Sequence, residues 1–197
     1  IHVNEDEQNI VMYFHGLEAF AKQASRVAVS DNGIDFVAKP DILGRTYFRV
    51  FQRPDAVYAM AMPGQFYRSQ DGYTGFEEGP RLFNPDMRHS ALLQRGNMMH
   101  VFWTQVGHAP ESILLSSIDL SDDWSTWQET EPIVMLRPEH PWEGADKPNE
   151  PSVRSTAYRH VNQLRDPAIF EEDGNVYLLY AVAGESGIAM AQVHLDN

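Results

Sequence analysis

Charged residues flank a predicted hairpin near the end of the sequence. The stretch from Leu164 to Val193 contains two alternating apolar runs around a polar turn, which predicts two antiparallel strands. Arg165 and Asp166 precede the first strand, and Glu185 follows the second. Asp166 lies before a proline, so it either caps a turn or presents a carboxylate for chemistry. Arg165 is either its ion-pair partner or a clamp for the carboxylate or hydroxyl groups of a ligand.

The same hairpin pattern occurs four times in one register. In each case an apolar residue is followed seven positions later by another one that opens a second alternating run, with turn-forming residues between them. The four pairs are Val3/Ile10, Val50/Val57, Leu92/Met99 and Ile169/Val176. Further strand-like material follows each of the first three hairpins, which gives about four strands per repeat.

Repeats of roughly 40 residues with four strands each are typical of β-propeller blades. The sequence therefore predicts one all-β propeller domain over residues 1–197, and a β-sandwich is the competing architecture. The only helical candidate, at residues 17–25, has one or two turns. The expected blades cover residues 1–44, 45–86, 87–136 and 164–197, with a long Pro-rich loop at 137–163.

This pattern contains about four blades, and it is incomplete at both ends. The first run begins inside an inner strand, and the last blade stops after its third strand. Unpaired strand edges promote association. We therefore expect either a partial propeller or a homodimer in which a second copy covers the exposed blade edge.

Composition excludes several classes of function. The net charge of −13 disfavours nucleic acid as a partner. The absence of cysteine excludes disulfides, thiolate zinc sites and thiol catalysis. The histidines lack metal-ligand spacing, so no metal or cofactor is expected. No apolar run is long enough to cross a bilayer and no signal-peptide pattern occurs, so no membrane partner is expected and the compartment stays open.

Up-and-down connectivity brings the chemically interesting residues to one rim of the predicted propeller. Three of the inner strands begin there, and the loops between second and third strands lie beside them, as does the long loop. Binding sites commonly use such loops on a rigid scaffold. The residues delivered to this rim are Tyr47, Arg88, His89, Arg165 and Asp166 from the strand starts, and His15, His108, Glu111, Trp142, Glu143, Asp146, Glu150 and Glu185 from the loops.

The segment LRDPAIFEEDGNVYLLY, which starts at Leu164, resembles the five-bladed propeller glycoside hydrolases of the superfamily that contains families 43 and 32. Other stretches resemble uncharacterised bacterial relatives of these enzymes. The resemblance implies hydrolysis or binding of an oligosaccharide, with Asp166 as base or nucleophile and either Glu111 or Glu185 as the acid. The residues expected to contact sugar are His89, Arg165, Glu143, Trp142, His15 and Tyr47.

The sequence departs from this family at two of the inner-strand starts. Tyr47 and His89 stand at positions where the family places catalytic carboxylates. An alternative is therefore a non-catalytic or vestigial propeller fragment, completed by homodimerisation, that binds sugar or a protein partner. A carboxylate pair across the rim favours the enzyme, whereas carboxylates neutralised by arginines favour the alternative.

Overall fold

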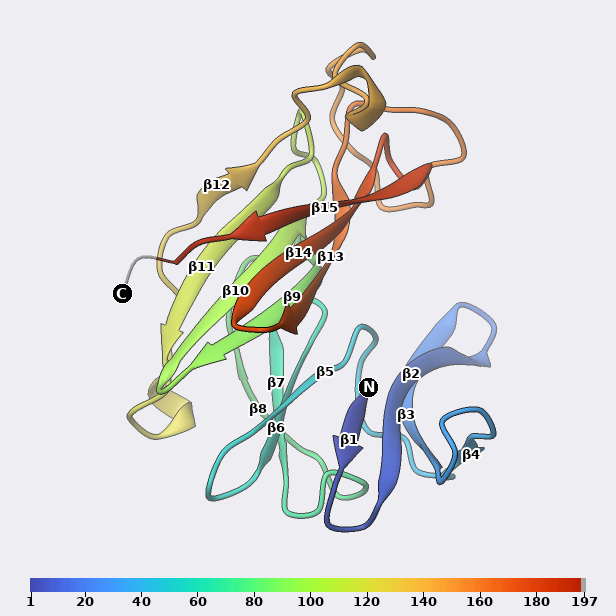
Figure 1. The fold of residues 1–197 in the computed structure, drawn as a ribbon, viewed down its shortest axis with the longest axis vertical. Helices are drawn as coiled ribbons and strands as arrows, with labels where there is room; N and C mark the ends of the chain where they lie inside the picture. The colour runs from blue at the N-terminus through green and yellow to red at the C-terminus, as the bar shows by residue number, and fades with distance from the viewer. Residues whose placement is uncertain (196–197) are drawn as a thin grey trace. The chain divides into compact units, whose positions relative to one another are not determined.

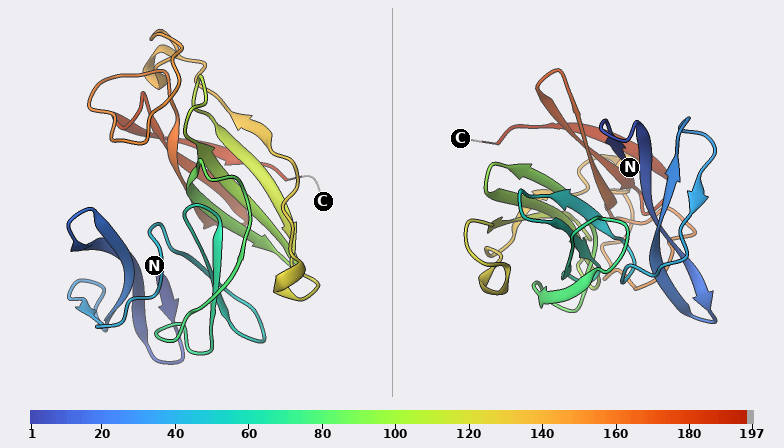
Figure 2. Two further views of the ribbon diagram at one scale, coloured as in Figure 1. Left: turned by 180° about the vertical axis from the view of Figure 1, so that it is seen from behind. Right: turned by 90° about the horizontal axis from the view of Figure 1, so that it is seen from below.

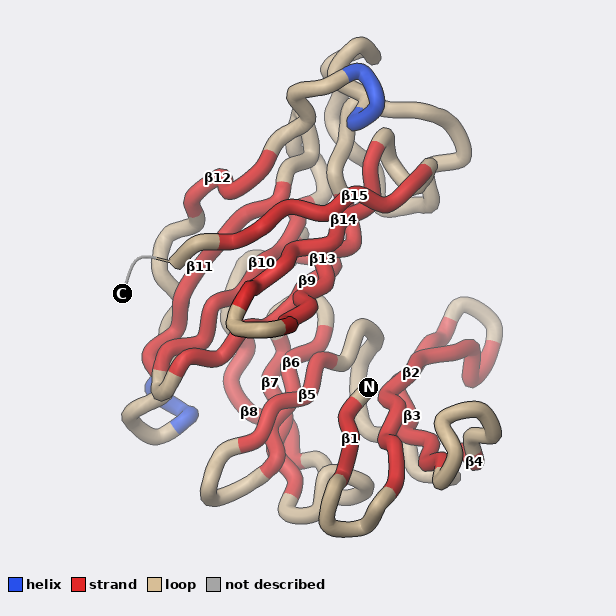
Figure 3. Tube along the Cα trace, in the orientation of Figure 1, coloured by secondary structure: helices blue, strands red, loops and turns tan. Residues whose placement is uncertain are grey.

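The computed structural model describes residues 1–195, which form four separate antiparallel sheets (Figure 1, Figure 3). In every sheet, consecutive strands of the chain are hydrogen-bonded neighbours. Three sheets have four strands, and the last has three among the described residues. The predicted all-β class with four-stranded antiparallel sheets is confirmed.

The first two sheets belong to one compact unit, residues 1–82. Tyr13 of one sheet donates a hydrogen bond of 2.9 Å to the carbonyl of Gly72 at the edge of the other. A buried cluster that includes Val27, Phe48 and Tyr67 fills the space between the sheets. The strands are β1 (His2–Asn4), β2 (Asn9–Ala19), β3 (Lys22–Ser30), β4 (Val37–Ala38), β5 (Arg49–Gln52), β6 (Val57–Ala61), β7 (Gln65–Ser69) and β8 (Glu77–Arg81).

The other two sheets belong to a second unit that starts at Phe83 (Figure 2). Two short 3-10 helices, η1 (Trp124–Thr126) and η2 (Pro141–Glu143), interrupt its loops. The strands are β9 (Met87–Arg95), β10 (Met98–Gln105), β11 (Ile113–Asp119), β12 (Ile133–Leu136), β13 (Arg165–Glu172), β14 (Asn175–Val182) and β15 (Gly187–Val193).

In this second unit the two sheets share one hydrophobic core. Strand β13 packs against β9 and β10, and the interface contains fully buried side chains such as Phe102, Leu164 and Leu178. Burial of these apolar groups on both sheets fixes the starts of β9 and β13 as neighbours. This packing positions the candidate site described below.

The four sequence repeats coincide with the first two strands of the four sheets. The first apolar residue of each pair lies in β1, β5, β9 or β13, and the second lies in β2, β6, β10 or β14. The period-two pattern of apolar residues was therefore sufficient to locate these eight strands, although β6 and β9 are buried on both faces over most of their length.

The helical candidate at residues 17–25 was wrong. Strand β2 continues to Ala19, and β3 begins at Lys22. These two residues are paired in the antiparallel ladder. The tip of this hairpin exposes Leu17 and Phe20. A one- or two-turn helix cannot repay its nucleation cost alone, and pairing with the adjacent strand satisfies the backbone instead.

The loop at residues 137–163, called the long loop below, contains the short helix η2 and no strand. Its backbone is anchored to the β10–β11 connection around the buried residue Ser152. The Ser152 amide donates to the carbonyl of His108 at 3.0 Å, and the Gly107 amide donates to the carbonyl of Ser152 at 3.1 Å. In Figure 1 the long loop extends beyond the strand ends of its own unit.

Replacement of Leu164 by alanine is expected to destabilise the protein by about 2–5 kcal/mol, because it opens a cavity in a fully buried core. Urea unfolding of the variant measures this loss. The matched control is Leu17→Ala at a 72% exposed position, which should change stability by less than about 0.5 kcal/mol. Equal effects from both variants would contradict the described core.

Candidate functional site

Three inner strands begin with the same backbone irregularity. Tyr47, His89 and Asp166 each adopt positive φ, at 58°, 34° and 48°. Each lies three residues before the first apolar residue of its repeat, at Val50, Leu92 or Ile169. Positive φ is uncommon outside glycine and clusters at functional sites. The repeat therefore carries a recurrent, strained position at the rim where we expected ligand binding.

In the second unit these residues form β-bulges. The register between β9 and β10 passes from Ser90 to Arg88 and so skips His89. Between β13 and β14 the register shifts from Ala168 to Arg165, which leaves Asp166 outside the ladder in the same way. A bulge re-aims one side chain while the strand continues. Consecutive residues consequently face different surroundings: the arginines are buried, and the side chain of Asp166 is 41% exposed.

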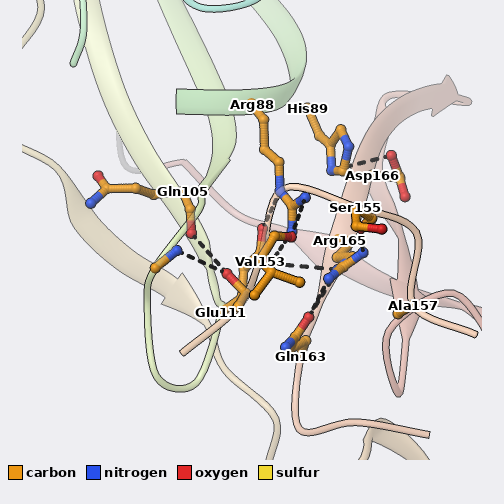
Figure 4. Close-up of polar contacts among 12 residues, drawn as sticks. Arg88, His89, Gln105, Glu111, Val153, Ser155, Ala157, Gln163, Arg165 and Asp166 are labelled. Atoms are coloured by element: carbon orange, nitrogen blue, oxygen red, sulfur yellow. Dashed lines mark hydrogen bonds and ion pairs between the residues drawn. The ribbon is translucent and has the colours of Figure 1, made fainter. Parts of the chain in front are cut away.

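Two buried arginines, Arg88 and Arg165, form an alternating charge network with Glu111 and Glu185. Figure 4 labels Arg88, Glu111 and Arg165 of this network. Arg88 makes a bidentate pair with Glu111, with Nε donating to Oε1 at 2.9 Å and Nη2 donating to Oε2. Arg165 Nη1 donates to Glu185 Oε1 at 2.6 Å. Arg165 Nε also lies 3.5 Å from Glu111 Oε2, which links the two sheets. Alternation of sign lets each buried charge face an opposite one.

This network is an internal repeat. Each arginine immediately precedes a bulged residue, and Glu111 and Glu185 each lie two residues before the third strand of the same sheet. Glu111 and Glu185 were predicted to occupy equivalent positions in successive blades, and they do so in the two sheets. Glu111 has no exposed surface, whereas the Glu185 side chain is 33% exposed.

The same arginines fasten the long loop to the strand starts. Arg88 Nη1 donates to the carbonyl of Val153 at 3.2 Å, and Arg165 Nη1 donates to that of Ser155 at 2.9 Å. Glu185 Oε1 accepts from the amide of Ala157 at 3.3 Å. Gln163 Oε1 completes the shell by accepting from Nε and Nη2 of Arg165. The guanidinium groups are therefore committed to protein partners.

Asp166 is the accessible group of the site, and the buried side chain of His89 lies beside it. Nδ1 of His89 lies 3.3 Å from Oδ1 of Asp166, and the His89 side chain is 8% exposed. Burial raises the pKa of Asp166, and the negative charge of Glu185 raises it further, while Arg165 and Arg88 oppose this rise. A carboxyl group with a raised pKa at an accessible position is suited to proton transfer.

Glu143 and Trp142 occupy different environments. The Glu143 carboxylate is buried and accepts hydrogen bonds from the amides of Glu139 and His140 at 2.9 and 3.0 Å. It also accepts from the hydroxyl of Tyr180 at 3.0 Å, and burial together with this pairing raises the pKa of Tyr180 to about 12. Glu143 thus holds the turn of η2. Trp142 is 55% exposed and stacks on the ring of His140.

The predicted binding residues of the first unit lie together. The rings of His15 and Tyr47 are 4.7 Å apart at an interplanar angle of 43°. Burial lowers the pKa of His15, and the charge of Arg49 adds to this effect. The pair offers an aromatic surface of the kind that packs against sugar rings.

Sequence reasoning assigned no site role to Arg88 or Gln163. A signal for Arg88 was present, because it occupies the same register position as Arg165, four residues before Leu92 and Ile169 respectively. Combined with the equivalence of Glu111 and Glu185, this repeat could have predicted two Arg–Glu pairs. Gln163 carries no comparable pattern, since its contact depends on how the long loop returns to β13.

Within residues 1–195, no group of three or more His, Asp or Glu side chains is arranged to hold a metal ion. No helix in this part of the chain has the length and apolar character to span a membrane. No protein-family model matches the sequence.

Solved structures with similar folds are glycoside-acting enzymes. Cellvibrio cellulosa α-L-arabinanase matches 99% of this chain and 73% of its own, with a TM-score of 0.61 and 12% identity. CoXyl43, a family-43 β-xylosidase/α-arabinofuranosidase from a compost metagenome, matches 96% and 68%, with a TM-score of 0.60 and 12% identity. The chain has the β-propeller fold of the family-43 glycoside hydrolases. The predicted resemblance is therefore confirmed at the level of fold.

Two further comparisons show which other proteins are similar to this chain in fold or in sequence. β-1,2-Mannobiose phosphorylase from Listeria innocua matches 88% of this chain and 50% of its own, with a TM-score of 0.57 and 14% identity. In sequence, an uncharacterized protein of Acanthamoeba polyphaga mimivirus is 34% identical over 212 aligned residues. That alignment covers 98% of this chain and 60% of the viral protein. The chain thus spans less than two thirds of this relative, and the predicted bacterial origin stays a prediction.

Replacement of Glu111 by glutamine should destabilise the protein by about 3–5 kcal/mol, because it leaves two buried guanidinium groups without their shared counter-charge. Chemical denaturation measures the loss. Glu171→Gln is the matched control, since Glu171 forms an exposed pair with Arg95 at 2.6 Å. Such pairs contribute at most about 1 kcal/mol. A loss at Glu111 as small as the control's would contradict a stabilising role for the network.

The raised pKa of Asp166 predicts a pH-dependent stability difference between the wild type and Asp166→Asn. Between the ordinary pKa of 3.8 and the raised value, the folded protein binds a proton that the unfolded chain releases. Wild-type stability relative to the variant therefore falls as pH rises through this window and is constant above it. Urea unfolding of both proteins from about pH 3.5 to pH 7 tests this linkage.

Asp146→Asn provides a control of opposite sign. The hydrogen bond from Lys147 lowers the pKa of Asp146, so wild-type stability relative to this variant should rise with pH. If the stability of the wild type relative to each variant changed with pH in the same direction for both variants, the environment described for Asp166 would be contradicted.

Proposed function

We propose that this chain is a glycoside-hydrolase-like module that binds an oligosaccharide at the rim formed by the starts of β9 and β13 and hydrolyses it. The observation that supports this most strongly is Asp166, an accessible carboxyl group on a strained bulge, with a raised pKa and with His89 at 3.3 Å. The fold supports the same proposal, because solved proteins that share it act on glycosides.

In this proposal Asp166 is the proton donor. In this role the proton of Asp166 passes to the glycosidic oxygen as the bond from that oxygen to the anomeric carbon breaks, and the raised direction of the pKa of Asp166 supports a donor. A water molecule then attacks the anomeric carbon and loses a proton to a second carboxylate. The sequence-based assignment of Asp166 as base or nucleophile is the alternative role of this carboxyl group.

Glu185 is the proposed second carboxylate. It is partly exposed, and the charge coupling between Glu185 and Asp166 indicates that the two groups lie near each other. Arg165 and the amide of Ala157 both bind Oε1 of Glu185, so Oε2 is the oxygen proposed to receive the proton. Glu111 has no exposed surface and is proposed to hold the two arginines rather than to contact substrate.

The remaining predicted binding residues receive supporting roles. We propose that His89 orients the Asp166 carboxyl group and that Arg165 orients Glu185. Trp142 and the His15/Tyr47 pair are proposed as aromatic surfaces for sugar rings within their own units. Glu143 is proposed to act only through the turn that carries Trp142. A homodimer through the edge of β15 remains part of the proposal.

A carbohydrate-binding module without turnover is the second candidate. One observation favours it: both glutamates of the site are paired with arginines, which leaves Asp166 as the one acidic group of the cluster not engaged by a guanidinium hydrogen bond in the described contacts. A site that binds sugar needs these charges only for architecture and orientation.

A hydrolysis screen separates these candidates. The substrates are arabino- and xylo-oligosaccharides and β-1,2-mannobiose, the last with and without inorganic phosphate, because enzymes named for these sugars share the fold. We expect release of reducing sugar that falls by about 10²-fold or more in Asp166→Asn, the loss typical of a general acid. Glu171→Gln, at the opposite end of the same strand, should retain wild-type turnover.

Unchanged turnover in Asp166→Asn would exclude Asp166 as the proton donor. Absence of turnover on every substrate, combined with sugar binding measured by calorimetry, would select the non-catalytic candidate.

A further inference from the structure

A cavity of about 720 Å³ lies beneath the long loop, and no step of the proposed chemistry uses it. Most of its wall comes from the loop segment 147–161, and Gln163 and Arg165 form its inner end. Cavities of this size accommodate molecules larger than a single small ion. The volume is appropriate for one or two sugar rings.

The wall of this cavity is positively charged in a chain that is strongly acidic. Lys147 and Arg159 contribute accessible cations, and Glu150 is the one acidic residue of the lining. The charge of Arg165 is compensated by Glu111 and Glu185, so the formal charge of the lining without Arg165 is +1 with His160 neutral. The whole chain carries −13. A positively charged concave site in an otherwise acidic protein attracts anionic ligands and raises their local concentration.

Two of these cations are available to a ligand. Arg159 is exposed and forms no ion pair with any residue in 1–195. Lys147 pairs with Asp146 at 2.7 Å, but both side chains are more than one third exposed, and such pairs exchange partners at little cost. Arg165 is fully engaged by Ser155, Gln163 and Glu185, so it offers a ligand no free donor.

The rest of the lining is apolar or aromatic. It includes Pro148, Pro151, Val153 and the exposed ring of Tyr158. Surfaces of this kind pack against the C–H faces of sugar rings, and an inorganic anion gains nothing from them. The combination of apolar wall and accessible cations therefore matches a ring that carries a carboxylate.

We infer that this cavity binds a uronic acid unit, with its carboxylate held by Arg159 and Lys147 and its ring against Tyr158 and the prolines. The inference rests on the proposed function and narrows it to acidic oligosaccharides. Arg165 connects the two sites, because it forms the inner wall of the cavity and pairs with Glu185 beside Asp166. In this inference the rest of the substrate extends from the cavity past Arg165 toward Glu185 and Asp166.

Calorimetric titration of the full chain with α-1,4-digalacturonate tests the inference. We expect binding about tenfold tighter than that of the neutral counterpart, α-1,4-galactobiose, because charge-assisted hydrogen bonds are the stronger ones. Arg159→Gln should weaken digalacturonate binding about fivefold or more by the same reasoning. Arg154→Gln is the matched control: Arg154 lies in the same loop but outside the cavity, near Asp86 at 3.5 Å, and its replacement should leave the affinity unchanged.

Three results would overturn the inference. They are equal affinity for the acidic and neutral disaccharides, unchanged affinity in Arg159→Gln, and inorganic phosphate binding more tightly than digalacturonate. The readout is independent of turnover. Digalacturonate binding without hydrolysis of any substrate would contradict the proposed activity but not this inference. Hydrolysis of neutral sugars without digalacturonate binding would contradict this inference but not the proposed activity.

Discussion

The site depends on one buried arrangement, the alternating network of Arg88, Glu111, Arg165 and Glu185. Two guanidinium groups that are almost completely removed from water are tolerable only because each faces a carboxylate. Glu111 receives both arginines and so ties the start of β9 to the start of β13. The remaining guanidinium donors hold the long loop by its carbonyl groups. Sheet packing, loop position and the surroundings of Asp166 all follow from this pairing.

The same network sets the electrostatics of the accessible carboxyl group. Within the four-residue network, two positive and two negative charges cancel. The pKa of Asp166 rises because burial and Glu185 outweigh the attraction of the arginines. The β-bulge is equally important, because it separates the direction of Asp166 from that of Arg165. A structural ion pair and a reactive group can therefore occupy consecutive positions in one strand.

The long loop has a double role in this arrangement. One side of it is fixed by the arginines, and the other side encloses a basic cavity that a strongly acidic chain would not be expected to maintain. Loops on rigid sheets commonly carry recognition residues, since their sequence is free of the alternation that strands require. Fixing such a loop by its backbone leaves its side chains, among them Arg159 and Tyr158, available for a ligand.

The sequence by itself determined the strands and the location of the site. The period-two pattern of apolar residues and the repeated register were enough to place the eight inner strands, because each sheet buries at least one face. The register also placed Asp166, His89 and Glu185 near one another, since hairpin connectivity leaves few alternatives. It did not determine what these residues do. Whether Glu111 is reachable, whether Glu143 is structural, and whether Asp166 holds a proton depend on contacts between segments far apart in the chain. Burial and opposing charge set those properties, and only the tertiary structure brings them together.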